Sequence, residues 1–101
     1  MGEKVQGGKQ EVVMKISKTA VAGTLESNDL FVTVEPSPAG CEIEIESIVK
    51  KRFGDQIEAA VQKVLDQFEV ENAKVSVMDR GAIDCTIMAR VETAILRAKG
   101  E

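Results

Sequence analysis

The sequence contains no histidine, tryptophan or tyrosine, and phenylalanine supplies its only 3 aromatic residues. Histidine is the side chain that most often transfers protons near neutral pH, so the usual proton shuttle of an enzyme is missing. No nucleophile stands beside a base in a recognisable pattern, and the glycines do not form a phosphate-binding loop. The sequence therefore predicts a protein without catalytic residues.

Cysteine is also scarce, with only Cys41 and Cys85 in the chain. They lie far apart, and no second cysteine or histidine stands close enough to either of them to form a metal-binding motif. We expect two buried free thiols in a reducing compartment, with Cys85 on the core side, and no metal site.

The chain has neither a basic surplus nor a long apolar run. Its 13 Lys and Arg residues stand against 17 Asp and Glu residues, which gives a net charge of -4. An acidic chain without a basic cluster does not attract phosphates, which argues against nucleic acids and anionic membranes as partners. No run approaches the roughly 18 apolar residues of a membrane span, and the N-terminus lacks a signal-peptide pattern. We expect a cytoplasmic protein whose partners are proteins or small molecules.

Hydrophobic residues make up 44% of the 101 residues. A chain of this size buries about 65% of its unfolded surface, and this composition is enough to supply such a core without disulfides. Residues 1–13 show no sustained periodicity, and we interpret them as a flexible N-terminal extension or an added leader. Residues 14–101 are expected to form one domain.

Two strands joined by a tight turn are predicted first. Val21 and Leu25 share one parity within residues 20–27, and the pair Asn28-Asp29 favours a turn. Residues 30–35 then alternate before a segment with two prolines stops the strand. This pattern is typical of a β-hairpin.

The clearest alternation follows in residues 41–46, where apolar residues and glutamates take opposite faces of a third strand. From Ser47, apolar residues recur at helical spacing as far as Phe68. We expect Ser47 to cap this long helix, and the pair Gly54-Asp55 is a candidate interruption with the aspartate as a second cap.

Residues 73–78 return to alternation and predict a fourth strand. Residues 83–88 suit either a strand or a helix, but the composition of residues 88–98 favours a helix with Asp84 as its N-cap. The resulting order, β-β-β-α-β-α, predicts an α+β fold in which a small, mostly antiparallel sheet carries two helices on one face.

The apolar positions that follow these periods predict one core between the sheet and the helices. They are Val21, Leu25, Val32, Val34, Ile43, Ile45, Phe53, Ile57, Val61, Val64, Phe68, Val75, Val77, Ile87, Val91 and Ile95.

The segment Gly23-Thr24-Leu25-Glu26-Ser27 places a serine at the tip of the predicted hairpin. Loops on a rigid scaffold often carry accessible functional side chains. A serine without a neighbouring base is not a nucleophile by itself, but it can be an attachment point that another enzyme modifies. Taken alone, a serine before Asn-Asp is also an ordinary turn former.

Three blocks of the sequence, in the same order, resemble the acyl carrier protein (gamma chain) of citrate lyase. They are AVAGTLESND at residues 20–29, KRFGDQI at residues 51–57 and DRGAIDC at residues 79–85. The resemblance extends from Met14 to about Ala98 and leaves only the N-terminal residues outside it.

The resemblance implies that Ser27 carries a phosphodiester-linked phosphoribosyl-dephospho-coenzyme A, with Gly23, Thr24, Leu25 and Glu26 as motif neighbours. The terminal thiol of this group would carry acetyl and citryl thioesters during cleavage of citrate to acetate and oxaloacetate. The implied partners are the citrate CoA-transferase (alpha) and citryl-CoA lyase (beta) subunits, a prosthetic-group transferase and an acetylating ligase. The cofactor would supply the chemistry, and the protein would present the cofactor to its partners. This division agrees with a chain that lacks catalytic side chains.

Other carriers and another class of protein stay open at this point. The acyl carriers of malonate decarboxylase and of citramalate lyase are alternatives, as is a small non-catalytic protein-binding module in which Ser27 is only a turn residue. The chain lacks the Asp-Ser-Leu motif at a helix start that is found in fatty-acid-type carriers, which look like four-helix bundles. Attachment of ordinary 4′-phosphopantetheine is therefore not expected.

Overall fold

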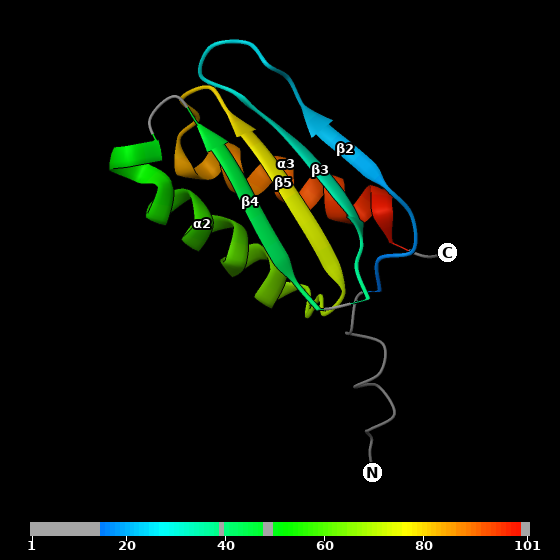
Figure 1. The fold of residues 1–101 in the computed structure, drawn as a ribbon. Helices are drawn as coiled ribbons and strands as arrows, with labels where there is room; N and C mark the ends of the chain where they lie inside the picture. Colours follow the sequence, from blue (N-terminus) through cyan, green and yellow to red (C-terminus); the bar gives the residue numbers. More distant parts are fainter. Residues whose placement is uncertain (1–14, 39, 48–49, 100–101) are drawn as a thin grey trace.

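The computed structural model describes residues 15–38, 40–47 and 50–99, with side chains described from residue 54 onward in the last range. The elements are β2 (Ala20–Gly23), β3 (Leu30–Pro36), β4 (Glu42–Ser47), α2 (Lys50–Gln67), β5 (Ala73–Asp79) and α3 (Asp84–Ala98). The predicted order and the absence of a helical bundle are confirmed for this part of the chain (Figure 1). The expected N-terminal extension and the side chain of Phe53 lie outside the described residues.

The four strands form one sheet in the order β2-β3-β5-β4. The β2–β3 and β3–β5 pairs are antiparallel, whereas β4 and β5 are parallel, because α2 returns the chain to the same end of the sheet between them. The sheet is thus mostly antiparallel, as predicted. The pairing of Leu30 with Asp79 brings the start of β3 beside the end of β5.

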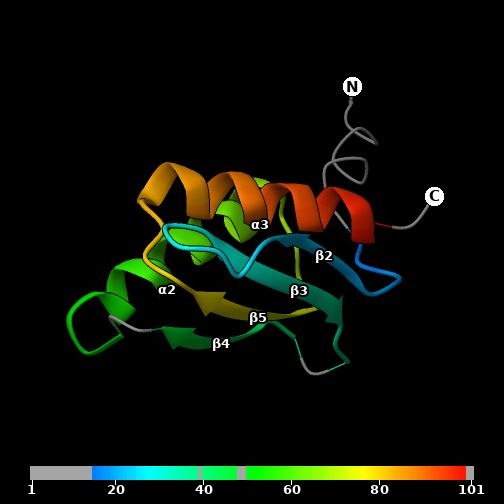
Figure 2. The same ribbon diagram turned by 90° about the horizontal axis from the view of Figure 1, so that it is seen from above.

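Both helices lie on one face of the sheet (Figure 2). Helix α3 contacts β2 and β3, and α2 contacts β4 and α3. The side chains between these layers are fully buried, and their alternation along the strands and helical spacing along α2 and α3 explain why the sequence forms these elements. Examples are Val32, Val34, Val61, Val64, Val75, Ile87, Val91 and Ile95.

The predicted inward face of β2 is wrong. Val21 is 43% exposed and Leu25 is 48% exposed, whereas Ala22 is 3% exposed. The strand is only four residues long, and its register with β3 pairs Ala22 with Val32, which faces the helices. The inward-facing residue of β2 is therefore the small Ala22, and its neighbour Val21 faces outward. Leu25 belongs to the turn that follows the strand.

Other members of the expected core lie at its margin. Ile43, Ile45 and Phe68 are partly buried and pack against the fully buried residues. Ile16 is only 1% exposed and belongs to the core, although it is not among the core positions predicted from the sequence. Its backbone exchanges hydrogen bonds of 3.2 and 3.0 Å with the side chain of Asn72, which fixes it beside the end of the sheet.

The cysteines are free but exposed, which corrects the expectation of two buried thiols. Cys41 precedes β4, and its thiol donates a hydrogen bond to the Val70 carbonyl at 3.3 Å. Cys85 is the second residue of α3, and because residues 84–90 are helical rather than extended, its side chain lies on the outer side of the helix.

The predicted interruption of α2 and the predicted cap of α3 are wrong. Ser47 is the last residue of β4, and its hydroxyl donates a hydrogen bond of 2.7 Å to Asp79. Its predicted role as the cap of the long helix depends on residues that lie outside the described ones. Helix α2 is continuous through Gly54-Asp55. Asp84 is the first residue of α3, whose N-cap is Ile83 without a side-chain cap hydrogen bond.

Strand β4 forms one edge of the sheet. Glu42, Glu44 and Glu46 are its exposed residues, and they alternate with Ile43 and Ile45, which pack on the core. The glutamates therefore project from the face opposite the helices. Lys74 of β5 forms a 3.7 Å ion pair with Glu44 on that face. Within the described residues, no helix is long and apolar enough to cross a membrane.

Candidate functional site

The segment Gly23–Ser27 leaves the end of β2 and forms most of the turn that leads into β3. Gly23 has φ +92°, and a Cβ at this position would overlap the Leu30 carbonyl oxygen, so the entry to the turn requires glycine. The Thr24 amide donates to that same carbonyl at 3.1 Å and closes the turn. Asn28 has φ 65°, a left-handed conformation that asparagine adopts more readily than most residues.

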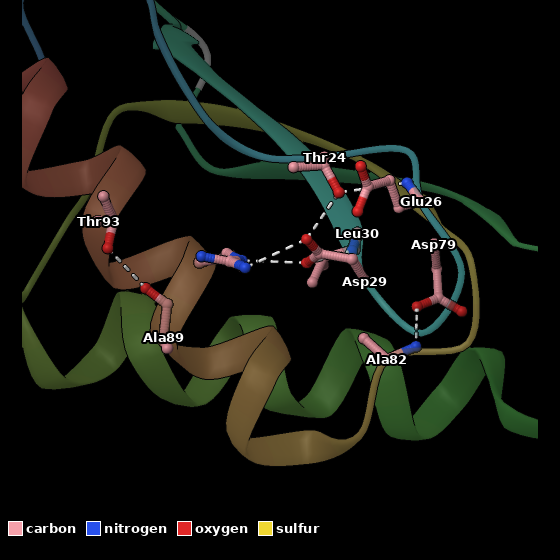
Figure 3. Close-up of polar contacts among 9 residues, drawn as sticks. Thr24, Glu26, Asp29, Leu30, Asp79, Ala82, Ala89 and Thr93 are labelled. Carbon is pink, nitrogen blue, oxygen red and sulfur yellow. Dashed lines mark hydrogen bonds and ion pairs between the residues drawn. The ribbon is translucent and has the colours of Figure 1, made fainter.

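The side chain of Asp29 organises this turn from within. One carboxylate oxygen accepts hydrogen bonds from the Leu30 amide at 2.7 Å and from Arg90 Nε at 3.0 Å. The other oxygen accepts from Thr24 Oγ1 at 2.8 Å and from Arg90 Nη2 at 3.1 Å. Figure 3 shows Asp29 between Thr24 and helix α3. The carboxylate therefore ties both ends of the turn to the helix layer.

These contacts favour the ionised form of Asp29. The hydrogen bond from Arg90, with further hydrogen bonds from Thr24 and the Leu30 amide, lowers the pKa of the Asp29 carboxyl from 3.8 to about 2, against the opposing effect of burial. The same pairing raises the pKa of Arg90 above its ordinary value. The ion pair is therefore present throughout the neutral and mildly acidic range.

A second set of hydrogen bonds holds the turn against the β5–α3 connection. The Asn28 amide donates to the Arg80 carbonyl at 2.8 Å, and the Arg80 amide donates to the Asp29 carbonyl at 2.9 Å. The buried carboxylate of Asp79 fixes this connection in turn, because it accepts from the amides of Gly81 at 3.1 Å and Ala82 at 3.0 Å (Figure 3). The turn is thus braced from two sides by backbone and carboxylate contacts.

Ser27 itself lies on the outside of this braced turn and is exposed, together with Leu25 and Glu26. No hydrogen bond from a described residue reaches its hydroxyl, and the chain contains no histidine to act as a base beside it. Such a hydroxyl is accessible to another enzyme but is not activated by its surroundings.

The structure brings the predicted site residues together but divides their roles. Gly23 and Thr24 shape the turn, whereas Leu25, Glu26 and Ser27 face outward. Asp29 and Arg90, which hold the turn, are not among the site residues predicted from the sequence. They lie 61 positions apart, and no local pattern links an aspartate in a turn to an arginine in a distant helix.

The described residues contain no group of three or more His, Cys, Asp or Glu side chains that could hold a metal ion. The Thr24 hydroxyl is engaged with Asp29, so what the turn offers chemically is the exposed hydroxyl of Ser27 at a fixed place on the surface.

A protein-family model described as "Malonate decarboxylase delta subunit (MdcD)", an acyl carrier protein family, matches residues 17–98. Similar curated proteins are the citrate lyase acyl carrier protein of Treponema denticola, 54% identical over 84% of this chain and 97% of the relative, and that of Haemophilus influenzae strain PittEE, 53% identical over 87% and 92%. The protein of the same name from Latilactobacillus sakei is 44% identical over 87% of each chain.

The fold is also found among solved structures. A chain in the crystal structure of a Pseudomonas malonate decarboxylase hetero-tetramer in complex with malonate superposes with a TM-score of 0.69 at 17% identity, over 85% of this chain and 90% of that chain. A protein from Thermus thermophilus superposes with a TM-score of 0.55 at 15% identity, over 84% of this chain and 16% of that chain. At these identities the likeness concerns the fold alone.

Proposed function

The chain belongs to the citrate lyase acyl carrier protein family, and we propose that Ser27 is the residue to which its prosthetic group is covalently attached. The protein is a carrier subunit rather than a catalytic one. The observation that carries the proposal is the exposed Ser27 hydroxyl on a turn that Asp29 holds to helix α3.

The group proposed is phosphoribosyl-dephospho-coenzyme A, joined to Ser27 through a phosphodiester. The residues present fit this group, because an exposed hydroxyl can form the ester bond, and the neighbouring Leu25 and Glu26 are exposed and leave space around it. When bound, the group supplies a terminal thiol that can carry acetyl and citryl groups as thioesters. Ser27 then serves as the anchor, and the hydrogen bonds of Asp29 keep that anchor at a constant position.

The catalytic steps on citrate belong, in this proposal, to partner proteins. They are the citrate CoA-transferase (alpha) and citryl-CoA lyase (beta) subunits, with a prosthetic-group transferase and an acetylating ligase that prepare the carrier. Tethering an acyl group to one small protein keeps it at a high effective concentration near successive active sites. We place this assembly in the cytoplasm, where reducing conditions keep a carrier thiol free.

A carrier for malonate decarboxylase is the second candidate. The description of the matching family model favours it. The relatives at 44–54% identity all carry the citrate lyase name, whereas the malonate decarboxylase chain is 17% identical, which favours citrate lyase. Acyl transfer to the loaded carrier, measured with citrate lyase subunits and with malonate decarboxylase subunits, distinguishes the two.

The attachment is tested by mass spectrometry of the chain produced with and without the modifying enzymes. We expect one cofactor-sized mass increment that peptide mapping assigns to Ser27. An increment on another residue, or no increment with active modifying enzymes, contradicts the proposal.

A further inference from the structure

An apolar hollow of about 340 Å³ lies between α2, α3 and the connection that joins β5 to α3. Its apolar lining includes Ile57 and Ile87, which are buried, and Ala82 and Ile83 from the connection. Gln56, Asp79 and Asp84 also line it. Ile83 is 66% exposed, the largest exposure among the large hydrophobic side chains of the described residues. An apolar side chain at the rim of an apolar hollow is typical of a binding surface rather than of a plain solvent face.

This hollow lies at the same end of the molecule as Ser27. Gly81 lines it, and a Cβ built on Gly81 would lie 3.6 Å from the side-chain oxygen of Asn28, the residue after Ser27. The neighbouring Arg80 exchanges backbone hydrogen bonds with Asn28 and Asp29. Figure 3 shows Glu26 and Asp29 of the turn that carries Ser27, which we call the attachment turn, in the same part of the molecule as Asp79 at the end of β5 and Ala82 of the connection. A group attached to Ser27 therefore starts beside the hollow.

The hollow continues along the two helices. A second hollow of about 330 Å³ shares Gln56 and Asp84 with the first and is also lined by Ala59, Lys63 and Met88. The two hollows are neighbours between α2 and α3, and we refer to both together as the α2–α3 groove. The apolar part of this groove is nearest to the attachment turn.

We propose that the α2–α3 groove binds the alkyl-amide and thioester end of the arm carried by Ser27 while the carrier is between partner subunits. This inference rests on the function proposed above. A flexible tether holds its end near such a site at an effective concentration in the millimolar range, so a site with a dissociation constant of about a millimolar would be occupied about half the time. The groove can therefore shield the thioester from solvent and still release it to a partner, which a tight site could not do.

Carrier produced with the modifying enzymes and carrier produced without them provide the first test. The methyl groups of Ile57, Ile83 and Ile87 are compared by NMR in the two forms, and Ile16 serves as the control because it pairs with Lys99 at the far end of α3. We expect the three groove methyl signals to shift when the arm is attached and the Ile16 signal to stay in place.

The second test measures how fast the arm thiol reacts with iodoacetamide, followed on the Ser27 peptide by mass spectrometry so that the exposed Cys41 and Cys85 do not interfere. Ile83→Asp puts a charge at the groove rim, and Leu96→Asp is the matched control because Leu96 is 42% exposed near the other end of α3. We expect Ile83→Asp to speed the reaction about twofold, the factor for a site that is half occupied, and Leu96→Asp to leave it unchanged.

The outcomes separate this inference from the function on which it rests. If Ser27 gains no mass with active modifying enzymes, both fail together. If Ser27 is loaded but the groove methyl signals and the thiol rate are unaffected, the groove inference alone is overturned. Methyl shifts that arise in the unmodified carrier only when a partner subunit is added would make the groove a protein-docking surface and would also overturn it.

Discussion

Arg90 of α3 donates two hydrogen bonds, of 3.0 and 3.1 Å, to the carboxylate of Asp29 in the turn that presents Ser27. Two parallel hydrogen bonds from a guanidinium fix orientation as well as distance. The position of the turn is therefore set by the helix layer as well as by strand β2, which is only four residues long.

Replacing Ser27 by Ala should abolish attachment of the prosthetic group and leave the fold intact. The side chain is exposed and no described residue bonds to it, so the free energy of unfolding should change by no more than about 0.5 kcal/mol. Intact mass and urea denaturation measure the two effects.

Ser47→Ala is the matched control for that variant. It removes the hydrogen bond to the buried Asp79 and should cost about 1 kcal/mol without preventing attachment. A full cofactor increment on the Ser27→Ala protein would reject Ser27 as the site.

Asp29→Ala should both destabilise the protein and slow the modification of Ser27. Arg90, Thr24 and the Leu30 amide all lose their acceptor. Because the Arg90 side chain is 42% exposed and can turn to water, we expect a cost of only about 1–2 kcal/mol. Denaturation midpoints and the initial rate of mass increase test this.

The exposed ion pair of Lys74 and Glu44 provides the comparison, since Glu44→Gln should change stability by less than about 0.5 kcal/mol. An Asp29→Ala protein as stable as wild type and loaded at the same rate would show that the ion pair does not hold the turn.

Acid should weaken the protein through Asp29 in a defined window. Its folded pKa of about 2 is below the ordinary 3.8, so its contribution to stability is fully present above about pH 4 and is lost as the pH falls through 2. Urea midpoints followed across this range should fall more steeply for wild type than for Asp29→Asn. Parallel curves for the two proteins would contradict the role of Asp29 in this loss of stability.

Truncation in the core should cost more for Val64 than for Ile45. Val64 is 1% exposed, whereas Ile45 packs at the margin of the core. We expect about 2–3 kcal/mol for Val64→Ala and about 1–2 kcal/mol for Ile45→Ala. Equal losses would indicate that the edge strand is packed more tightly than its exposure suggests.

The acetylated carrier alone should not release oxaloacetate from citrate. The sequence holds no histidine, and the described residues show no metal cluster and no base hydrogen-bonded to Ser27. Release is expected only after addition of the transferase and lyase subunits, and a coupled assay for oxaloacetate follows it. Sustained release in proportion to carrier concentration, without the partners, would identify an active site in this chain.

The periodic segments could be predicted from the sequence, and the short ones could not. Alternation in residues 30–35 and 73–78 and helical spacing in α2 reflect one buried face, which is a local property of the chain. The face of β2 depends on its register with β3, so the parity of its residues alone predicts the wrong side for Val21. For residues 83–88, the helix rather than a strand turns Cys85 outward.

The site was predictable in position but not in construction. A serine before Asn28-Asp29 predicted an exposed turn residue, and the turn lies there. The partners of Asp29 depend on how α3 is placed over the sheet, and the support from Asp79 depends on the pairing of β5 with β3. Such contacts arise only from tertiary packing.

The row of glutamates on β4 has a consequence for contacts between copies of this protein. An edge strand has unpaired backbone groups that can recruit a strand from a second molecule. Pairing two such edges would place Glu42, Glu44 and Glu46 of one copy against the same carboxylates of the other, and like charges on neighbouring strands repel. The charge pattern of this edge thus opposes self-association into continuous sheets and favours carriers that stay separate even when they are crowded together.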